Sequence, residues 1–282
     1  MSAVGFIGLG QIGGPMAAHL VDNPGGLVVC DVRPEATASF AEKGAKVAAD
    51  PAEVAKSVDV ISVMVRDDDQ VREVVGGILT TARAGTIVAL HSTIRAGTAE
   101  HLAELAARTR VTVVDAPVAG GFIGAAGASL AVMIGGPAEA VERCREPFGR
   151  WASLIVHVGP VGAGTRAKLA RNLLQFAAYG AASEAQRLAE AAGIDLLALA
   201  NVVRHSDRVT GGPGAIMLRS TTAPLAGDDP LFAILSHTRD LGEKDLALAL
   251  ELGRELGVDL PFTALALERF AKGLGLEPGS VP

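Results

Sequence analysis

Short apolar runs rich in β-branched residues alternate with amphipathic helical stretches through the first half of the chain. Such runs are typical of strands that are buried on both faces of a sheet. The runs are AVGFIG (3–8), LVVCDV (27–32), VDVISVMV (58–65), GTIVALHS (85–92), RVTVVDAP (110–117), SLAVMIGG (129–136) and SLIVHVG (153–159). The first half is therefore predicted to be an α/β domain, with a mostly parallel sheet that helices cover on both sides.

The pattern changes near residue 160, after which apolar residues recur with a helical period. A long helix is predicted from near Gly162 to about Gly193. Further helical stretches are LLALANVVRHS (196–206), FAILSHTRDLGEKDLALALELGRELG (232–257) and FTALALERFAKGLG (262–275). The composition of VGPVGAG (158–164) places a domain boundary at residue 160. We therefore expect an α/β domain at 1–160 and an all-α domain at 161–282, built on the long interdomain helix and ending in a flexible tail at 275–282.

Composition and charge narrow the classes of function. The 282 residues are 49% hydrophobic and carry a net charge of -6, with no cluster of Lys and Arg that could follow a nucleic acid backbone. Cys30 and Cys144 lack metal or redox spacing, and the six histidines show no paired ligand spacing. With neither a signal peptide nor a membrane-spanning apolar run, we expect a cytoplasmic protein that acts on a small molecule, with no nucleic acid, membrane or metal partner.

A glycine pattern follows the first predicted strand, in VGFIGLGQIGGPMAAHL (4–20). Gly8, Gly10 and Gly13 have the G-x-G-x-x-G spacing of a dinucleotide-binding loop, in which bare backbone approaches a pyrophosphate at a helix N-terminus. Gln11 and Ile12 lie inside the loop and are predicted to contact the same cofactor. The motif predicts a doubly wound sheet of the Rossmann type.

Asp31 ends the second predicted strand, at the distance where such domains carry an acid for the adenosine ribose. A carboxylate there accepts hydrogen bonds from the ribose hydroxyl groups and repels a 2′-phosphate, which favours NAD over NADP. Arg33 lies two residues later and leaves NADP open, because a guanidinium can hold that phosphate.

A second motif lies at the start of the long helix, in GPVGAGTRAKLARN (159–172). Lys168 and Asn172 are four residues apart and share one helical face, among apolar neighbours. Burial would lower the pKa of such a lysine and let it exchange a proton with an alcohol or carbonyl oxygen while hydride moves to or from a nicotinamide. Asn172 would then orient the lysine or the substrate.

Together with DAPVAGG (115–121) and KDLALA (244–249), these motifs resemble the β-hydroxyacid dehydrogenase family, especially its 3-hydroxyisobutyrate dehydrogenase branch. The resemblance implies a homodimer or homotetramer assembled through helical domains. It makes Lys168 catalytic and Asn172 substrate-orienting. Positions that match the family's cofactor contacts are Val65, Thr93 and Lys244, the last of which also lies near the substrate. Gly120 and Gly121 match glycines whose amides receive a substrate carboxylate.

The chain departs from this family at two places. Ala119 stands where the family usually has a serine that helps bind the carboxylate, so a contact at this position loses one hydrogen bond. His237 lies seven residues before Lys244, where relatives often have an aromatic residue. It is either a substrate contact or a packing or surface histidine.

The expected activity is the NAD-dependent interconversion of a short β-hydroxy acid and its semialdehyde or oxo acid. Reductases of tartronate semialdehyde, succinic semialdehyde and glyoxylate belong to the same branch. Imine reductases share the architecture but usually replace the lysine that Lys168 matches. From another class, an NAD-binding regulator without catalysis would need only the first domain.

Overall fold

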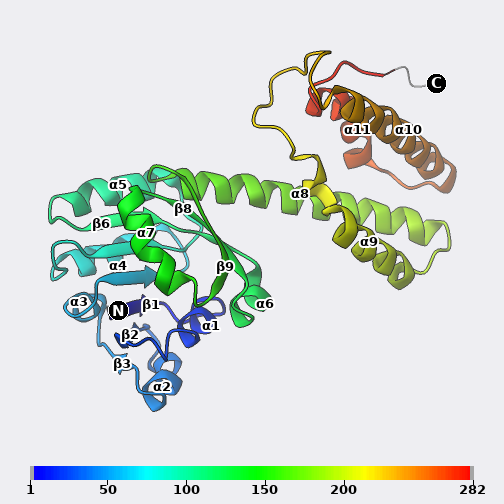
Figure 1. The fold of residues 1–282 in the computed structure, drawn as a ribbon. Coiled ribbons are helices and arrows are strands. Elements are labelled where there is room, and N and C mark those ends of the chain that lie inside the picture. Colours follow the sequence, from blue (N-terminus) through cyan, green and yellow to red (C-terminus); the bar gives the residue numbers. More distant parts are fainter. Residues whose placement is uncertain (1–2, 280–282) are drawn as a thin grey trace. The chain divides into compact units, whose positions relative to one another are not determined.

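The computed structural model describes residues 3–279, and the chain divides into two compact units, Met1–Arg171 and Asn172–Pro282. Figure 1 draws the units as ribbons coloured along the sequence. The sequence placed the boundary at residue 160, whereas the units divide after Arg171, inside a long helix. The difference arises because the first turns of that helix are hydrogen-bonded to the first unit, as described below.

The first unit is built on one mixed sheet. Its strands are β1 (Val4–Ile7), β2 (Leu27–Cys30), β3 (Lys46–Val47), β4 (Val60–Val63), β5 (Ile87–Leu90), β6 (Thr112–Asp115), β7 (Val118–Ala119), β8 (Leu130–Gly135) and β9 (Ala152–Gly159). Their order is β3-β2-β1-β4-β5-β6-β8-β7, with β9 paired to β8. The pairs from β3 to β6 are parallel, as is β8 with β9, whereas β8 runs antiparallel to β6 and β7.

Helices cover both faces of this sheet, since successive strand residues point to opposite sides. The helices of this unit before the long one are α1 (Gly13–Ala18), α2 (Pro34–Glu42), α3 (Pro51–Ala55), α4 (Asp68–Leu79), α5 (Ala96–Ala107), α6 (Gly121–Ala126) and α7 (Ala138–Phe148). Phe6 and Val60 pack with α1, α2 and α7 in one core. Ile7 and Ile61 pack with α3, α4 and α5 in the other. The predicted Rossmann-type domain is confirmed, and each of its seven predicted strands is present.

The second unit is helical. The long helix α8 (Ala163–Ala191) enters it, followed by α9 (Leu196–Thr210), the 3-10 turn η1 (Gly212–Ile216), α10 (Phe232–Leu256) and α11 (Pro261–Gly273). Glu184 is buried and ties α8 to the start of α11: its carboxylate accepts the N–H groups of Phe262 and Thr263 at 2.7 and 2.9 Å. The predicted all-α domain on a long helix is thus confirmed.

The segment after α11 includes the residues 275–279 of the predicted flexible tail, and these make contacts with the helical unit. Leu276 is buried against Leu235 and Leu274. The carbonyl of Glu277 accepts a hydrogen bond from Arg239, and the N–H of Gly279 donates to Glu243. The flexibility of this segment stays a prediction, and residues 280–282 lie outside the described part. Among residues 3–279, no helix is long and apolar enough to cross a membrane.

Candidate active site

The glycine loop between β1 and α1 has the backbone geometry that a dinucleotide needs. Gly8 has φ +92°, and a Cβ atom there would lie 2.2 Å from the carbonyl oxygen of Met64. At Gly13, a Cβ would lie 2.0 Å from the carbonyl oxygen of Gly8. Gly10 is exposed and faces open space, and Gln11 and Ile12 follow it before the helix begins. The loop therefore fits a bound pyrophosphate at Gly10, while Gly8 and Gly13 allow the tight turn and the close helix packing.

Asp31 lies directly after β2, beside this loop. Its Oδ2 accepts the N–H of Leu9 at 2.7 Å, and its Oδ1 accepts the N–H and Nε of Arg33 at 2.9 and 3.2 Å. Burial alone raises the pKa of Asp31, but these hydrogen bonds and the Arg33 charge outweigh it, so the pKa lies below its ordinary value. Asp31 is therefore an anion at neutral pH, as a ribose acceptor must be.

The ends of β4 and β5 form the next part of the rim. The Ser92 hydroxyl accepts the N–H of Val65 at 3.0 Å and donates to its carbonyl at 2.6 Å, which joins the two strand ends. Val65 borders the glycine loop, since its Cγ1 would lie 3.1 Å from a Cβ at Gly8, and Thr93 is exposed beside Ser92. The structure thus places the glycine loop, Val65 and Thr93 at the carboxyl ends of neighbouring strands, where ligands bind in open α/β sheets.

Lys168 lies on α8 and meets the DAPVAGG segment. Its Nζ donates a hydrogen bond of 2.6 Å to the carbonyl oxygen of Val118, the residue before Ala119. Gly120 and Gly121 follow with φ +130° and +62°, conformations that favour glycine, and Gly121 faces open space. The lysine therefore binds the backbone two residues before the glycines that were predicted to receive a carboxylate.

The surroundings of Lys168 favour its neutral form. Burial is the main cause that lowers the pKa of Lys168, and the positive charge of Arg171 lowers it further. Residues 116–137, which include β7, α6 and β8, contain no titratable side chain. In this part of the chain, the lysine thus meets a neutral backbone acceptor and no carboxylate that would raise its pKa again, which suits a group that exchanges a proton.

Asp115 has a role that the sequence analysis did not assign. It is fully buried at the end of β6, and its Oδ1 and Oδ2 accept the N–H groups of Gly162 and Thr165 at 2.7 and 2.6 Å. These donors lie at the N-terminal end of α8, so Asp115 caps the helix that carries Lys168. In the sequence, the one signal for it is an acid at the end of a predicted apolar strand, the first letter of DAPVAGG.

His91 follows β5 directly and is a buried core residue. Its ring nitrogens lie 2.7 Å from the carbonyl oxygen of Ala116 and 3.0 Å from the hydroxyl of Ser62, and burial lowers its pKa to about 4. It is therefore neutral and packs against Phe148 and Trp151. Among the described residues, no group of three or more His, Cys, Asp or Glu side chains is placed to hold a metal ion.

The remaining predicted residues belong to the helical unit. Asn172 follows Lys168 by one turn on α8. His237 and Lys244 are both exposed on α10, and the Nζ of Lys244 lies 3.1 Å from a carboxylate oxygen of Asp245. Their contacts with cofactor and substrate stay predictions.

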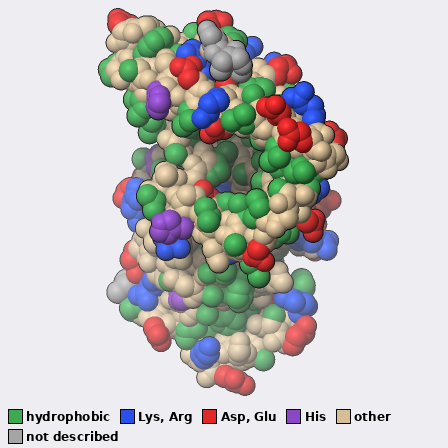
Figure 2. Space-filling view, turned by 90° about the vertical axis from the view of Figure 1, so that its right-hand side faces the viewer, with side chains coloured by type: hydrophobic (Ala, Val, Ile, Leu, Met, Phe, Trp, Pro, Cys, Tyr) green, Lys and Arg blue, Asp and Glu red, His purple; other side chains and the backbone are tan. Residues whose placement is uncertain are grey.

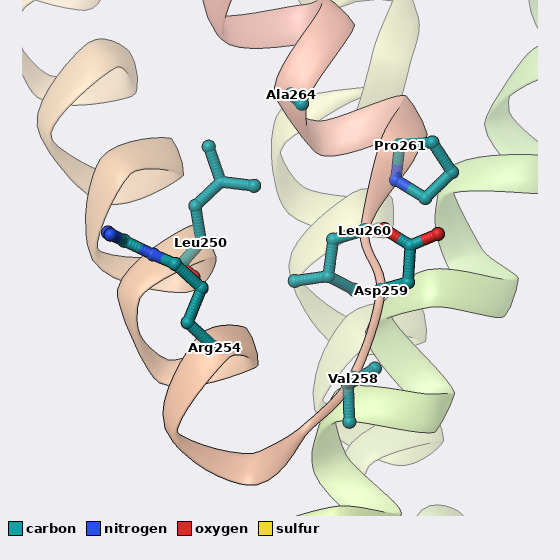
Figure 3. Close-up of a pocket in the computed structure, with 7 residues that line it drawn as sticks. All are labelled: Leu250, Arg254, Val258, Asp259, Leu260, Pro261 and Ala264. Atoms are coloured by element: carbon teal, nitrogen blue, oxygen red, sulfur yellow. The ribbon is translucent and has the colours of Figure 1, made fainter.

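The helical unit also contains a pocket of about 280 Å³ between the end of α10 and the start of α11. In Figure 3, Leu250 on α10 and Leu260 at the start of α11 lie on opposite sides of it. The lining residues are Leu250, Arg254, Val258, Asp259, Leu260, Pro261 and Ala264. None of the predicted site residues is among them.

Comparison with known families decides what this arrangement is. Residues 3–159 match the model for the NAD-binding domain of 6-phosphogluconate dehydrogenase. Residues 162–277 match the model for the NAD-binding region of NADP-dependent 3-hydroxyisobutyrate dehydrogenase. The chain belongs to the β-hydroxyacid dehydrogenase family. The resemblance drawn from its motifs is thereby confirmed, and this β-hydroxyacid dehydrogenase is an NAD(P)-dependent enzyme of the 3-hydroxyisobutyrate dehydrogenase type.

Two curated relatives cover nearly the whole dehydrogenase. An uncharacterised oxidoreductase of Mycobacterium tuberculosis is 58% identical over 97% of this chain and 93% of its own length. The 3-hydroxyisobutyrate dehydrogenase of Pseudomonas aeruginosa is 32% identical over 96% of this chain and 92% of its own. Full-length similarity of this kind extends the family assignment to both units.

Solved structures agree on the fold. A Mycobacterium avium protein described as an oxidoreductase is 51% identical and matches with a TM-score of 0.94, over 98% of this chain and 99% of that one. The 3-hydroxyisobutyrate dehydrogenase of Mycobacterium tuberculosis, studied with L-serine, is 31% identical with a TM-score of 0.68, over 96% and 93%. An imine reductase of Streptomyces aurantiacus matches with a TM-score of 0.76 over 98% and 96%, but at 20% identity this shows the fold alone.

Proposed function

We propose that this dehydrogenase interconverts a short, 3-hydroxyisobutyrate-like β-hydroxy acid and its semialdehyde or oxo acid, with NAD as cofactor and Lys168 as general acid and base. The observation that carries the proposal is the 2.6 Å hydrogen bond from Lys168 Nζ to the Val118 carbonyl. It holds the lysine beside Gly120 and Gly121, whose backbone can receive a carboxylate. A β-hydroxy acid has its carboxylate and its reacting hydroxyl group only a few atoms apart, which suits this spacing.

Each residue of the proposed site has one role in the reaction. Bound NAD supplies the hydride acceptor for oxidation of the alcohol carbon. Neutral Lys168 takes the hydroxyl proton during oxidation, and protonated Lys168 returns it to the carbonyl oxygen during reduction. Gly120 and Gly121 hold the carboxylate, and Asn172, one turn along α8, orients the reacting oxygen. Ala119 supplies no hydroxyl group to the carboxylate, so the glycine amides carry more of its binding.

The preference for NAD rests on Asp31. Its carboxylate is buried, with 6% of the side chain exposed, and is anionic at neutral pH. The guanidinium of Arg33 is directed onto this carboxylate through Nε. A 2′-phosphate would therefore meet a fixed negative charge whose neighbouring cation is already engaged, whereas a ribose hydroxyl can still donate to the carboxylate.

A spectrophotometric screen of short 3-hydroxy acids with NAD, and then with NADP, tests the proposal. Lys168→Ala is expected to lower kcat by about 10²- to 10⁴-fold, the usual contribution of general acid–base catalysis, while NADH binding is retained. Lys43→Ala, which removes an exposed lysine at the end of α2, is the matched control and should leave kcat unchanged. Turnover of a 3-hydroxy acid that does not depend on Lys168 would refute the role assigned to the lysine.

The same screen separates the alternative activities. Tartronate semialdehyde, succinic semialdehyde and glyoxylate are included as substrates for reduction, together with a cyclic imine. Faster Lys168-independent turnover of the imine would identify an imine reductase. NADH binding without turnover of any compound in the screen would favour a regulator.

We further propose that the enzyme is a homodimer or homotetramer assembled through its helical unit. Within the described part of that unit, six hydrophobic residues are buried: Ala189, Leu235, Leu260, Ala271, Leu274 and Leu276. Many large apolar side chains are exposed instead, among them Leu173 at 72%, Leu197 at 74% and Val209 at 74%. Figure 2 shows hydrophobic side chains at the surface over much of the face that it draws.

Exposed apolar surface on this scale is typical of a protein–protein interface. Because most soluble oligomers consist of copies of one chain, we expect a second copy of this chain to bury it. Sedimentation equilibrium is expected to give two or four times the chain mass of 28.7 kDa. A monomer at micromolar concentration would contradict this part of the proposal.

A further inference from the structure

The Asp115 carboxylate connects two parts of the site that are distant in sequence. It begins the DAPVAGG segment, whose glycines receive the carboxylate in the proposed function, and it caps α8, which carries Lys168. Both of its oxygens are used, by donors 47 and 50 residues further along the chain. A single buried side chain therefore sets where the lysine helix starts relative to the substrate loop.

Close backbone packing at the same place leaves the helix little freedom. A Cβ at Gly164 would lie 2.5 Å from the carbonyl oxygen of Asp115 and 2.4 Å from that of Met133. A Cβ at Gly135 would lie 2.4 Å from Asp115 Oδ1. The first turn of α8 thus rests directly on β6 and β8, at van der Waals distance, with the Asp115 carboxylate between the helix and the sheet.

Lys168 is one turn beyond this contact. It follows Thr165 by three residues, and residues three apart on a helix lie on neighbouring positions of one face. Any shift or rotation of the first turn would therefore move Nζ away from the Val118 carbonyl, to which it is bonded at 2.6 Å.

We propose that Asp115 is a positioning residue for catalysis: by holding the N–H groups of Gly162 and Thr165, it sets the register of α8 that places the Lys168 amine over the Val118–Gly121 loop. The proposal rests on the proposed function, because it takes Lys168 as the acid and base. Asp115 itself is buried behind the loop, touches no solvent and takes no part in proton transfer.

Asp115→Asn tests the proposal with almost no change in size. The amide keeps one acceptor oxygen but turns an N–H donor toward one of the two backbone donors, so one hydrogen bond is lost and the first turn must move. We expect kcat for the 3-hydroxy acid to fall by about 10²-fold, as for a displacement of about 1 Å, with the Kd for NADH unchanged. Glu184→Gln is the matched control: it alters another buried helix-capping carboxylate, in the helical unit, and should leave kcat unchanged.

A double-mutant cycle distinguishes positioning of the lysine from support of the fold alone. If Asp115 acts through Lys168, Asp115→Asn in the Lys168→Ala background should cost less than about twofold more in kcat, because residues that act as a unit are not additive. A full and multiplicative further loss would overturn the proposal. Should Asp115→Asn not accumulate as folded protein, Asp115→Ser, which also keeps one acceptor, replaces it in the cycle.

A measurement without turnover keeps this inference separate from the proposed function. The rate at which acetic anhydride labels Lys168, followed by peptide mass spectrometry, is recorded against pH for the wild type and for Asp115→Asn. Displacement of the lysine into water should move the labelling midpoint to higher pH. An unchanged midpoint would overturn the positioning role, whereas absence of turnover by the wild type would overturn only the proposed function.

Discussion

Cofactor selectivity offers a sharp test, because the hydrogen bonds of Asp31 can be counted. A carboxylate offers about four acceptor sites. Three are taken by Leu9 N–H at 2.7 Å, Arg33 N–H at 2.9 Å and Arg33 Nε at 3.2 Å. About one site remains for a ribose hydroxyl. Asp31→Asn keeps the shape and one acceptor oxygen but removes the charge.

The expected effects on the two cofactors have opposite signs. For NAD, a charge-assisted hydrogen bond becomes a neutral one, which costs about 1–1.5 kcal/mol, or roughly 5- to 13-fold in kcat/KM. For NADP, removal of a unit negative charge about 4 Å from the phosphate relieves between about 1 and 4 kcal/mol, depending on solvent screening. Since Arg33 offsets part of that repulsion, we expect a gain of about tenfold, and a change in the NAD to NADP ratio of about 50- to 100-fold.

Steady-state kinetics with each cofactor at saturating hydroxy acid measure this ratio. Asp59→Asn is the control, because Asp59 also pairs with an arginine, Arg83, at 2.8 Å, but lies just before the amino end of β4. A wild type that uses NADP as well as NAD would refute the reasoning. The reasoning would also fail if Asp31→Asn changed the NAD to NADP ratio of kcat/KM no more than the control variant does.

Three further outcomes follow from single residues. Burial, and then the positive charge of Arg171, holds the pKa of Lys168 below its usual value. Arg171→Leu removes that charge, so the rising limb of the pH profile for oxidation should move to higher pH. A limb at the same pH as in the wild type would contradict this. Ala119→Ser should lower KM for 3-hydroxyisobutyrate by up to about 150-fold, for a charged hydrogen bond of about 1.5–3 kcal/mol, and an equal KM would argue against a carboxylate at this loop. Glu184→Ala should lower the free energy of unfolding by about 1–3 kcal/mol at neutral pH, measured by urea denaturation. Burial raises the pKa of Glu184, but the hydrogen bonds from the N–H groups of 262–263 outweigh burial, so the pKa is lower in the folded state than in the unfolded state. The stabilisation is therefore present above the unfolded-state pKa and is lost as the pH falls through the folded-state pKa. An equal loss of stability in Glu184→Ala at acid pH would refute this assignment.

Features set by local motifs were predicted correctly from the sequence. The GxGxxG spacing predicted the turn at Gly8 and the close packing at Gly13, because both follow from the backbone of a few consecutive residues. The long helix was predicted from near Gly162 to about Gly193 and runs from Ala163 to Ala191. Its periodicity extends over many turns, so the prediction did not depend on any distant contact.

Features that depend on the meeting of distant segments were not predicted. The two-residue strands β3 and β7 were not predicted, since each has too few residues to show a period and is a strand only through its neighbour. The hydrogen bonds of Glu277 and Gly279 to residues of α10 were not foreseen either, because no local pattern reveals them. The cap from Asp115 to α8 is a contact of the same kind.

The sequence by itself determined the two-part organisation and the dinucleotide loop, because these follow from hydrophobic periodicity and from the spacing of a few consecutive residues, and it singled out Lys168 as a candidate. Only the tertiary structure decided that Lys168 bonds to the loop at Val118, that Asp31 is already held by Leu9 and Arg33, and that Asp115 holds the helix rather than the substrate. Apart from the local contact of Arg33 with Asp31, these roles depend on burial and on partners 22 to 50 positions away in the sequence, which only the folded chain brings within hydrogen-bonding distance.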